Sequence, residues 1–336
     1  MPTEAPGCRT LCSVRLHHGR LAAPLTVALI GLTACTSHGS PAAKSATSTP
    51  SASGVTTSSS ASPSPTVTTK PPGPKLVQLP FGGRQILPKY RIVAYYGNGQ
   101  SKALGVLGHY TPDVAAVQVA AAAKKFATAT RPALPAIELI ATLVDGFKGS
   151  DGDYSHDSTP EQIQPYLDAA RKHHELLILD LQPGRRNFLT VAKLYERFLL
   201  QPDVGVALDS EWRMGPDQVP GKVIGHVTAA EVNSVTAYLS KLTVSHGLPQ
   251  KLVVLHNFTQ QMIPDRTKVK SAPALAVIWH FDGHGDRNNK LFGYNLLKVK
   301  KPFFNGFKLF LKADINIFKP SEVEALSPAP DFISYQ

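Results

Sequence analysis

The chain has 336 residues, of which 35 are Lys or Arg and 24 are Asp or Glu, so its formal net charge at pH 7 is +11. Hydrophobic residues make up 43% of it, which is enough for a sizeable core and excludes a chain that is disordered throughout. The basic residues are spread along the sequence rather than gathered in a stripe with aromatic residues, so the charge predicts no nucleic-acid interface. The net positive charge is consistent with a location among anionic wall polymers or lipid head groups, or with a role in solubility alone.

The first segment of the sequence has the features of an export signal. Three arginines, Arg9, Arg15 and Arg20, form a basic stretch, and residues 21–32 are almost wholly apolar. This apolar run has the length of the hydrophobic region of a secretory signal and is too short to cross a bilayer as a permanent helix. The sequence therefore predicts that the chain is exported.

A cysteine stands directly after the apolar run. The four residues Leu32-Thr33-Ala34-Cys35 resemble the lipobox of bacterial lipoproteins, in which a small residue allows cleavage before the cysteine and the sulfur takes a diacylglycerol. The resemblance implies that residues 1–34 are a signal peptide, that Cys35 is lipidated, and that the mature protein is extracytoplasmic and lipid-anchored to the bacterial cell membrane. The alternative is an ordinary secretory signal with a cysteine there by chance.

The other cysteines and the next segment extend this organisation. Cys8 and Cys12 lie within the predicted signal, so the mature chain would hold one cysteine and neither a disulfide nor a thiolate metal site. Between Thr36 and Lys70 nearly every residue is Ser, Thr, Ala, Pro or Gly. Such a segment buries too little apolar surface to offset the entropy of ordering it, so we expect residues 35–75 to form a disordered tether.

Residues 76–336 are expected to form a single (β/α)₈ barrel of the TIM-barrel type. Their number, about 260, is typical of that fold. Eight short apolar runs alternate with helical patterns, as they do when parallel strands are covered by helices. An open, doubly wound sheet is the alternative, although the glycine-rich phosphate motif found in many such sheets does not follow the first strand. The predicted strands are Arg91–Tyr96, Ala136–Leu143, Leu176–Leu181, Val204–Leu208, Lys251–His256, Leu275–Phe281, Phe307–Leu311 and Asp331–Tyr335.

Helix-capping patterns mark several of the connections between these strands. A capping box over residues 159–162, with a proline in the first turn, predicts a helix that runs to about residue 174. A second capping box over 228–231 begins another helix, and further helices are expected over 113–126 and 187–200. Between the fifth and seventh strands the helical pattern is weak, which predicts that one or two barrel helices are missing or distorted there.

In a barrel of this type the functional groups gather at the carboxyl ends of the strands. The predicted strand ends are rich in polar and aromatic side chains, of which we expect the carboxylates of the third and fourth strands to be catalytic and the others to bind substrate. These residues are Tyr95 and Tyr96 on the first strand, Asp180 on the third, Asp209, Glu211 and Trp212 on the fourth, His256 on the fifth, and His280 and Asp282 on the sixth. The pattern predicts a polar mouth at one end of the barrel.

Three carboxylates form the centre of this predicted site. Asp209 and Glu211 are two residues apart, so both side chains point to the same side of an extended strand, and Asp180 lies on the neighbouring strand. Carboxylates crowded into a closed mouth push their pKa values apart, so that one stays protonated as a general acid while another stays charged. The aromatic residues nearby would supply flat surfaces on which sugar rings stack.

The segment 207–212 resembles an element of two families of barrel enzymes. It is similar to the Asp-x-Glu element of the glycoside hydrolase family 25 muramidases, which cut peptidoglycan, and to the last part of the family 18 chitinase motif. The resemblance implies that Glu211 is the general acid and Asp209 its charged partner. Residues 94–97 lack the acidic element of the muramidases, and Ala207 replaces an acid of the chitinases. The mature domain also resembles barrel-like lipoproteins of actinobacteria, which implies export and attachment but no particular reaction.

Other kinds of site find less support. Residues 280–286 place His and Asp at alternate positions, and Asp151, Asp153 and Asp157 form a second oxygen-rich loop, but neither segment has the ligand spacing of a zinc or calcium site. The sequence holds no Gly-x-Ser-x-Gly elbow for a serine nucleophile. We therefore expect no metal and no other cofactor.

Two functions of different kinds remain open at this point. In the first, a surface lipoprotein hydrolyses cell-wall or other polysaccharide with Glu211, Asp209 and Asp180. In the second, a non-catalytic lipoprotein binds glycan or a protein through the same mouth. A structural explanation of the acidic pair is open as well, because an acid at a strand end often caps a helix or pairs with a loop arginine, here Arg213 or Arg185.

Replacement of Cys35 tests the predicted anchor. We expect the Cys35→Ser variant to lose incorporation of a palmitate analogue and to be released to the medium, because no other cysteine follows the apolar run. Metabolic labelling followed by fractionation measures both effects, and Cys12→Ser, within the predicted signal, serves as the control that keeps the label. A Cys35→Ser protein that stays in the membrane would instead indicate an uncleaved anchor.

Overall fold

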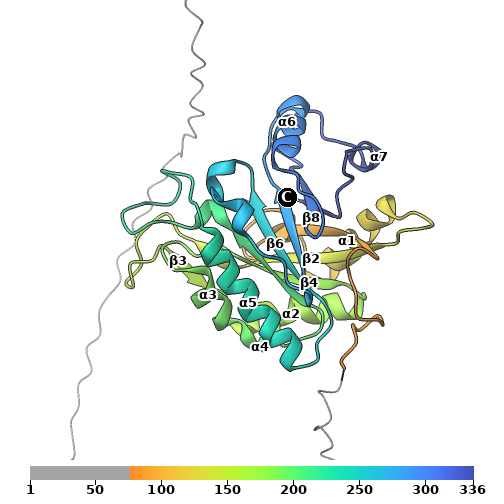
Figure 1. Ribbon diagram of the computed structural model, residues 1–336, viewed down its shortest axis with the longest axis horizontal. Helices are drawn as coiled ribbons and strands as arrows, with labels where there is room; N and C mark the ends of the chain where they lie inside the picture. The colour runs from red at the N-terminus through yellow and green to blue at the C-terminus, as the bar shows by residue number, and fades with distance from the viewer. Residues whose placement is uncertain (1–75) are drawn as a thin grey trace, which may run out of the picture. The chain divides into compact units, whose positions relative to one another are not determined.

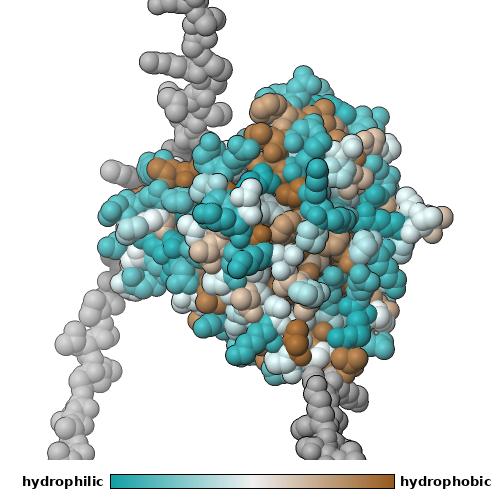
Figure 2. Space-filling model, in the orientation of Figure 1, coloured by the Kyte–Doolittle hydropathy of each residue, from teal (hydrophilic) through white to brown (hydrophobic). Residues whose placement is uncertain are grey.

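The computed structural model describes residues 76–336. The predicted signal peptide, the lipidation site at Cys35 and the tether over residues 35–75 lie outside the described residues. Within the described part of the chain, no helix combines the length and the apolar character that crossing a membrane requires. On the face drawn in Figure 2, hydrophilic residues are interspersed with smaller groups of hydrophobic ones.

Eight parallel strands close into a barrel (Figure 1). In order around the barrel they are β1 (Arg91–Gly97), β2 (Ala133–Val144), β4 (Leu176–Leu181), β5 (Val204–Asp209), β6 (Lys251–Asn257), β7 (Leu275–Phe281), β8 (Phe304–Leu309) and β9 (Phe332–Tyr335). Strand β1 pairs with both β2 and β9, which closes the sheet, and a short strand, β3 (Ser155–Asp157), is antiparallel to the outer end of β2. The closure confirms the predicted barrel and excludes the open, doubly wound sheet.

Helices and single turns of 3₁₀ helix connect the strands. The α-helices are α1 (Pro112–Ala123), α2 (Pro160–Lys172), α3 (Phe188–Leu194), α4 (Glu196–Leu199), α5 (Ala229–Ser245), α6 (Arg287–Leu297) and α7 (Pro320–Glu324). The 3₁₀ turns are η1 (Val106–His109), η2 (Lys124–Phe126), η3 (Ser210–Trp212), η4 (Gln260–Met262) and η5 (Arg266–Lys268). Figure 1 shows α2, α3, α4 and α5 together on the outside of the strands.

The predicted elements agree with this arrangement except in four places. The helix expected over residues 187–200 is divided at Tyr195 into α3 and α4. Strands β2 and β8 each begin three residues before the predicted position, at Ala133 rather than Ala136 and at Phe304 rather than Phe307. Between β6 and β7 only the turns η4 and η5 occur, as the weak pattern predicted, whereas α6 between β7 and β8 is a regular helix.

Two layers of apolar side chains hold the barrel together. Alternate residues of a strand point to opposite faces, so Leu177 and Leu179 of β4 pack under the helices while Leu176 and Ile178 point into the barrel. The interior layer is apolar only in its amino-terminal half, where Ile178 lies among residues such as Val254 and Phe332. Because both faces of each strand are buried, the strands read as continuous apolar runs.

The segment before β1 closes the amino-terminal end of the barrel. Leu79, Ile86 and Leu87 are buried against the interior apolar residues. The side-chain oxygen of Gln250 accepts hydrogen bonds of 2.9 Å from the backbone N–H groups of both Ile86 and Leu87. Arg84 adds hydrogen bonds of 2.9 Å to the carbonyl groups of residues 247 and 248. The barrel therefore has a closed base, and its open end is the carboxyl end.

Truncation of Leu87 tests the contribution of this base. The side chain is fully buried, so we expect Leu87→Ala to lower the free energy of unfolding by about 2–5 kcal/mol through lost burial and the cavity it leaves. Urea denaturation measures the effect. Leu76→Ala is the matched control, because Leu76 is 66% exposed and its loss should change stability by less than about 0.5 kcal/mol. Equal stability of the two variants would contradict the closed base.

Candidate active site at the mouth of the barrel

Each of the eight strands carries one buried polar side chain directly above the apolar interior. All eight are at most 3% exposed and occupy inward positions, two residues beyond an inward apolar or glycine residue. In order around the barrel they are Tyr96, Glu138, Asp180, Asp209, His256, His280, Lys308 and Ser334. A complete ring of polar groups inside a barrel is costly to bury unless its members satisfy one another. The interior thus changes from an apolar core to a polar site above the inward apolar or glycine residue of each strand.

A cavity of about 550 Å³ opens above this ring. Its charged and aromatic lining residues are Tyr96, Asp209, Glu211, Trp212, Phe258, Asp282, His284, Lys308 and Phe310. Gln182 and Gln336 add amide groups to the same walls. The volume lies within the range of small-molecule sites, and its mixture of aromatic surfaces and convergent polar groups is typical of them.

One histidine joins two carboxylates below the cavity. His256 Nε2 lies 3.0 Å from Glu138 Oε1, and His256 Nδ1 lies 3.0 Å from Asp282 Oδ2. Burial alone would lower the pKa of His256, but the charge of Glu138 and the hydrogen bonds to Asp282 and Glu138 outweigh it and raise that pKa well above its usual value. We therefore assign a charged imidazolium to this position.

The charge on His256 determines whether Asp282 is ionised. Burial alone would raise the pKa of Asp282, but the hydrogen bond and the charge of His256 lower it. Asp282 is therefore an ionised carboxylate, and it lies on the wall of the cavity. Through this contact the buried ring fixes one permanent negative charge at the site.

Asp180 and Tyr96 form a second group in the ring. The Tyr96 hydroxyl donates to Asp180 Oδ2 at 3.1 Å and accepts from the Gln182 amide at 3.0 Å. Burial raises the pKa of Asp180 to about 7, although the charge of His256, 3.8 Å away, opposes the rise. The Lys308 ammonium lies 3.6 Å from the centre of the Tyr96 ring, close enough for a cation–π contact.

Asp209 and Glu211 both reach the cavity, but they do so from different elements. Asp209 ends β5, and Glu211 lies in the following turn, η3, rather than on the strand. The Glu211 carbonyl accepts a 2.7 Å hydrogen bond from Gly225 N–H. A side chain at position 225 would lie 2.4 Å from that carbonyl oxygen, so glycine is required for the approach. This contact sets the backbone that carries Glu211.

The pKa values of Asp209 and Glu211 are both raised, which favours the neutral form of each carboxyl group. Burial and the negative charge of Asp282 raise the pKa of Glu211 to about 7. Burial, with the nearby Asp180, raises the pKa of Asp209 well above its usual value. Near pH 7 the cavity therefore holds Glu211 as an acid able to give or take a proton, beside the ionised Asp282.

His280 is the neutral histidine of the ring. Its Nε2 lies 2.8 Å from Ser334 Oγ, and its ring meets that of His256 edge to face at 5.0 Å. Burial and the charge of His256 lower the pKa of His280 well below its usual value. A side chain at position 306 would lie 2.3 Å from His280 Nδ1, so Gly306 makes room for the imidazole.

The structure brings most of the predicted site residues together, with three corrections. Tyr95 points outwards and packs against Tyr335, because successive residues of a strand face opposite sides, so it is not a substrate platform. Asp180 is in register with Ala207 rather than with Asp209, so it lies deeper in the barrel. His256 and His280 are completely buried below the cavity and cannot contact a substrate directly.

The two loop arginines expected as structural partners of the acidic pair make their contacts elsewhere. Arg213 pairs with Glu231 at 2.9 Å. Arg185 donates to the carbonyl of Gln218 and lies over the Tyr154 ring. Neither arginine therefore neutralises Asp209 or Glu211.

Three members of the ring are missing from the sequence-based site. Glu138, Lys308 and Ser334 stand within strands whose residues are mostly apolar, which gives them the appearance of isolated polar residues. Their common signal is register, because each is two residues beyond an inward apolar or glycine position. That signal becomes readable only when the inward face of every strand is known.

The two oxygen-rich loops are used for structural contacts. Arg186 forms ion pairs of 2.7 Å with both Asp153 and Asp157. Asp286 caps α6 by accepting from the backbone N–H groups of Asn288 and Asn289. Within residues 76–336, no three or more His, Cys, Asp or Glu side chains are grouped so as to hold a metal ion.

The chain matches no protein-family model, and no curated protein matches it. The geometry and the electrostatics of the mouth are therefore the guide to a function.

Replacement of His256 tests the buried bridge. We expect His256→Gln to lower the free energy of unfolding at pH 6 by about 3–5 kcal/mol, because it leaves two buried carboxylates without their cation. The raised pKa of His256 means that its stabilisation is present below the unfolded value of about 6.5 and is lost as the pH rises through the folded-state pKa. The lowered pKa of Asp282 means that its stabilisation is present above about 3.9.

Both contributions are therefore present at pH 6, where urea denaturation should be measured. The control is His226→Gln, at an exposed histidine away from the ring, for which we expect a change within about 0.5 kcal/mol. A His256→Gln protein as stable as this control would show that the bridge carries no net stabilisation.

Proposed function

We propose that the barrel hydrolyses glycosidic bonds of a cell-wall or other polysaccharide, with Glu211 as the general acid. The observation that carries the proposal is the pairing, in one aromatic-lined cavity, of Glu211, whose pKa is raised to about 7, with Asp282, which is held ionised. Glycoside hydrolysis needs one carboxyl group that donates a proton to the leaving oxygen and a second, charged one that supports the positive transition state. The resemblance of residues 207–212 to the muramidase element points to the same acid.

The electrostatics change the roles of the other carboxylates. Sequence reasoning makes Asp209 and Asp180 the charged partners of Glu211, but burial favours the neutral form of both. Asp282 is the carboxylate that His256 keeps ionised. We therefore assign to Asp282 the stabilisation of the developing positive charge on the sugar, and to Asp209 the donation or acceptance of a hydrogen bond beside Glu211.

The walls of the cavity suit a sugar ring. Trp212 and Phe258 offer apolar surfaces, and Gln182 and Lys308 offer donors to hydroxyl or carbonyl oxygens. Such a combination of flat apolar surface and directional polar groups matches the two kinds of face that a sugar ring presents. With the predicted lipid at Cys35, the enzyme would act on polymers next to the cell membrane.

Binding of glycan without hydrolysis is the second candidate. The observation that favours it is the absence of acids at two positions, since the first strand carries Tyr96 at the site and Ala207 stands two residues before Asp209. The families that the segment resembles carry acids at the corresponding places. The same mouth would then hold a polysaccharide without cleaving it.

Replacement of Glu211 separates the two candidates. We expect Glu211→Gln to lower the release of reducing ends from peptidoglycan or chitin oligomers by about 10²–10⁴-fold, the usual contribution of a general acid. In the wild type, kcat/KM should fall as the pH rises through about 7, because the pKa of Glu211 is raised to about 7 and the protonated form is the active one.

The matched control is Asp217→Asn, at an exposed acid of the same connection between β5 and α5, which should keep wild-type activity. Hydrolysis that survives in Glu211→Gln would contradict the assigned acid. Binding of the oligomers by a wild type that releases no reducing ends would favour the non-catalytic candidate.

A further inference from the structure

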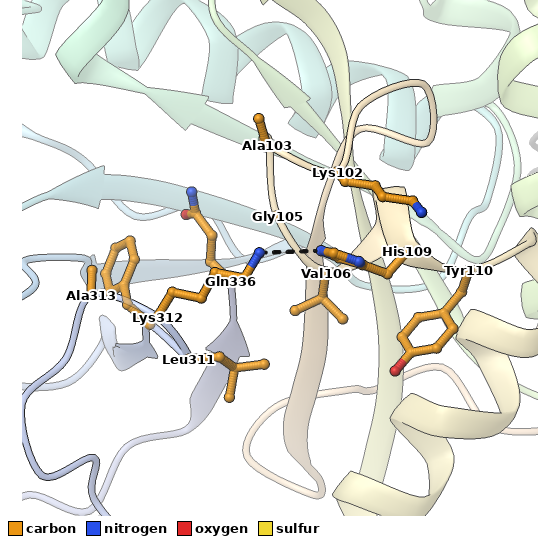
Figure 3. A pocket seen from close by; sticks show the side chains of 11 residues that line it. Lys102, Ala103, Gly105, Val106, His109, Tyr110, Leu311, Lys312, Ala313 and Gln336 are labelled. Carbon is orange, nitrogen blue, oxygen red and sulfur yellow. Dashed lines mark hydrogen bonds between the residues drawn. The ribbon is translucent and has the colours of Figure 1, made fainter. Parts of the chain in front are cut away.

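A second cavity, of about 380 Å³, lies at the same end of the barrel. One side is formed by the connection between β1 and α1, which supplies Lys102, His109 and Tyr110. The other side is formed by the segment after β8, which supplies Lys312 (Figure 3). Both segments follow the carboxyl ends of strands, where barrel enzymes build their binding sites.

The second cavity is positively charged. Lys102 and Lys312 line it, and none of its lining side chains is acidic. Among the described residues neither lysine forms an ion pair with Asp or Glu. Lys312 Nζ instead lies 3.5 Å from His109 Nε2, across the cavity, as the dashed line in Figure 3 shows. Two lysine ammonium groups therefore line one hollow that has no acidic side chain in its lining.

The second cavity adjoins the mouth cavity. Phe310 and Gln336 line both of them. The backbone holds this shared wall in place, because Gln336 N–H donates to the Leu309 carbonyl at 2.9 Å and Leu311 N–H donates to the Gln336 carbonyl at 2.8 Å. A chain of sugars that fills the mouth can therefore place a neighbouring unit, or a substituent of it, beside the two lysines.

We propose that the second cavity binds an oxyanion group, a carboxylate or a phosphate, carried by the glycan whose sugar ring occupies the mouth. The inference rests on the proposed function and narrows its substrate to anionic polysaccharides. An oxyanion would accept hydrogen bonds from the ammonium groups of Lys102 and Lys312 and from the Tyr110 hydroxyl. Val106 and Leu311 supply an apolar floor for the carbon atoms that carry the oxyanion.

The charges in the mouth favour binding of the oxyanion in the second cavity rather than in the mouth. In the mouth the ionised Asp282 lies with Glu211, Asp209 and the Lys308 ammonium. An anionic substituent placed there would repel Asp282 and make Glu211 harder to deprotonate. In the second cavity the same substituent would meet two lysine side chains and no acidic side chain. An anionic glycan would therefore take one orientation along the two cavities.

Binding measurements on three oligosaccharides of equal length test the proposal. One is a neutral chitin oligomer, one carries carboxylates, as a peptide-free peptidoglycan strand does, and one carries phosphates. Calorimetric titration uses the full chain with Glu211→Gln, so that turnover does not consume the ligand. We expect tighter binding of an anionic oligomer than of the neutral one, and a preference that weakens as salt is raised from 50 to 500 mM, roughly the range over which exposed charges become screened.

Removal of the two charges assigns the effect to the second cavity. Lys102→Gln with Lys312→Gln should weaken binding of the preferred anionic oligomer by about five- to tenfold and leave the neutral oligomer unchanged. Lys241→Gln, at an exposed lysine of α5, is the matched control and should change neither affinity. Whichever of the carboxylated and phosphorylated oligomers loses more affinity identifies the oxyanion.

The outcomes distinguish this inference from the proposed function. Equal affinity for neutral and anionic oligomers, or an anionic preference that survives the double substitution, would overturn the inference even if the wild type hydrolyses glycan. Charge-dependent binding at Lys102 and Lys312 by a wild type that hydrolyses none of the three oligomers would support the oxyanion site and overturn the hydrolase.

Discussion

The mouth of this barrel depends on one buried contact, in which His256 lies between Glu138 and Asp282. Carboxyl groups enclosed together repel one another, and each isolated charge there would cost several kcal/mol. A single imidazolium with hydrogen bonds of 3.0 Å on both sides offsets that cost for two of them. It also determines which acid is ionised, because Asp282 touches His256 while Asp209 and Glu211 make no hydrogen bond to it. The chemistry of the cavity thus follows from a residue that a substrate cannot contact.

That contact needs the apolar base beneath it. The residues that fill the amino-terminal half of the barrel, such as Ile178, Val254 and Phe332, are fully buried. Their packing fixes the register of all eight strands, so the next inward residue of every strand belongs to the polar ring. The closure by Leu87 and its neighbours keeps water from entering at the base. A polar ring with no access to water from below has a low local dielectric, and this strengthens each hydrogen bond in it.

The sequence predicts the strands well because each of them is buried on both faces. Their apolar runs are continuous, and six of the eight predicted strands match the observed ones within about two residues at each end, inside the usual uncertainty of element boundaries. The site is less predictable, because a residue belongs to it only if its side chain points into the barrel. Tyr95 and Tyr96 are adjacent and chemically alike, yet only Tyr96 points inwards. Glu138 is hidden for the opposite reason, because one acid in an apolar run carries no sign of a partner 118 residues away.

The charge states of the acidic residues are even harder to predict from the sequence than the direction in which each side chain points. Asp209 ends a strand and Asp282 directly follows one, so the sequence does not distinguish these two aspartates. The contact with His256 lowers the pKa of Asp282, whereas burial raises the pKa of Asp209. The two cavities extend this separation of roles. Strand ends carry Asp209 and Lys308 of the mouth, so their placement follows the packed barrel, whereas loops carry Lys102 and Lys312 of the second cavity. Loop residues can change without disturbing the core, so the preference for a charged glycan can vary independently of the machinery that the barrel holds in place.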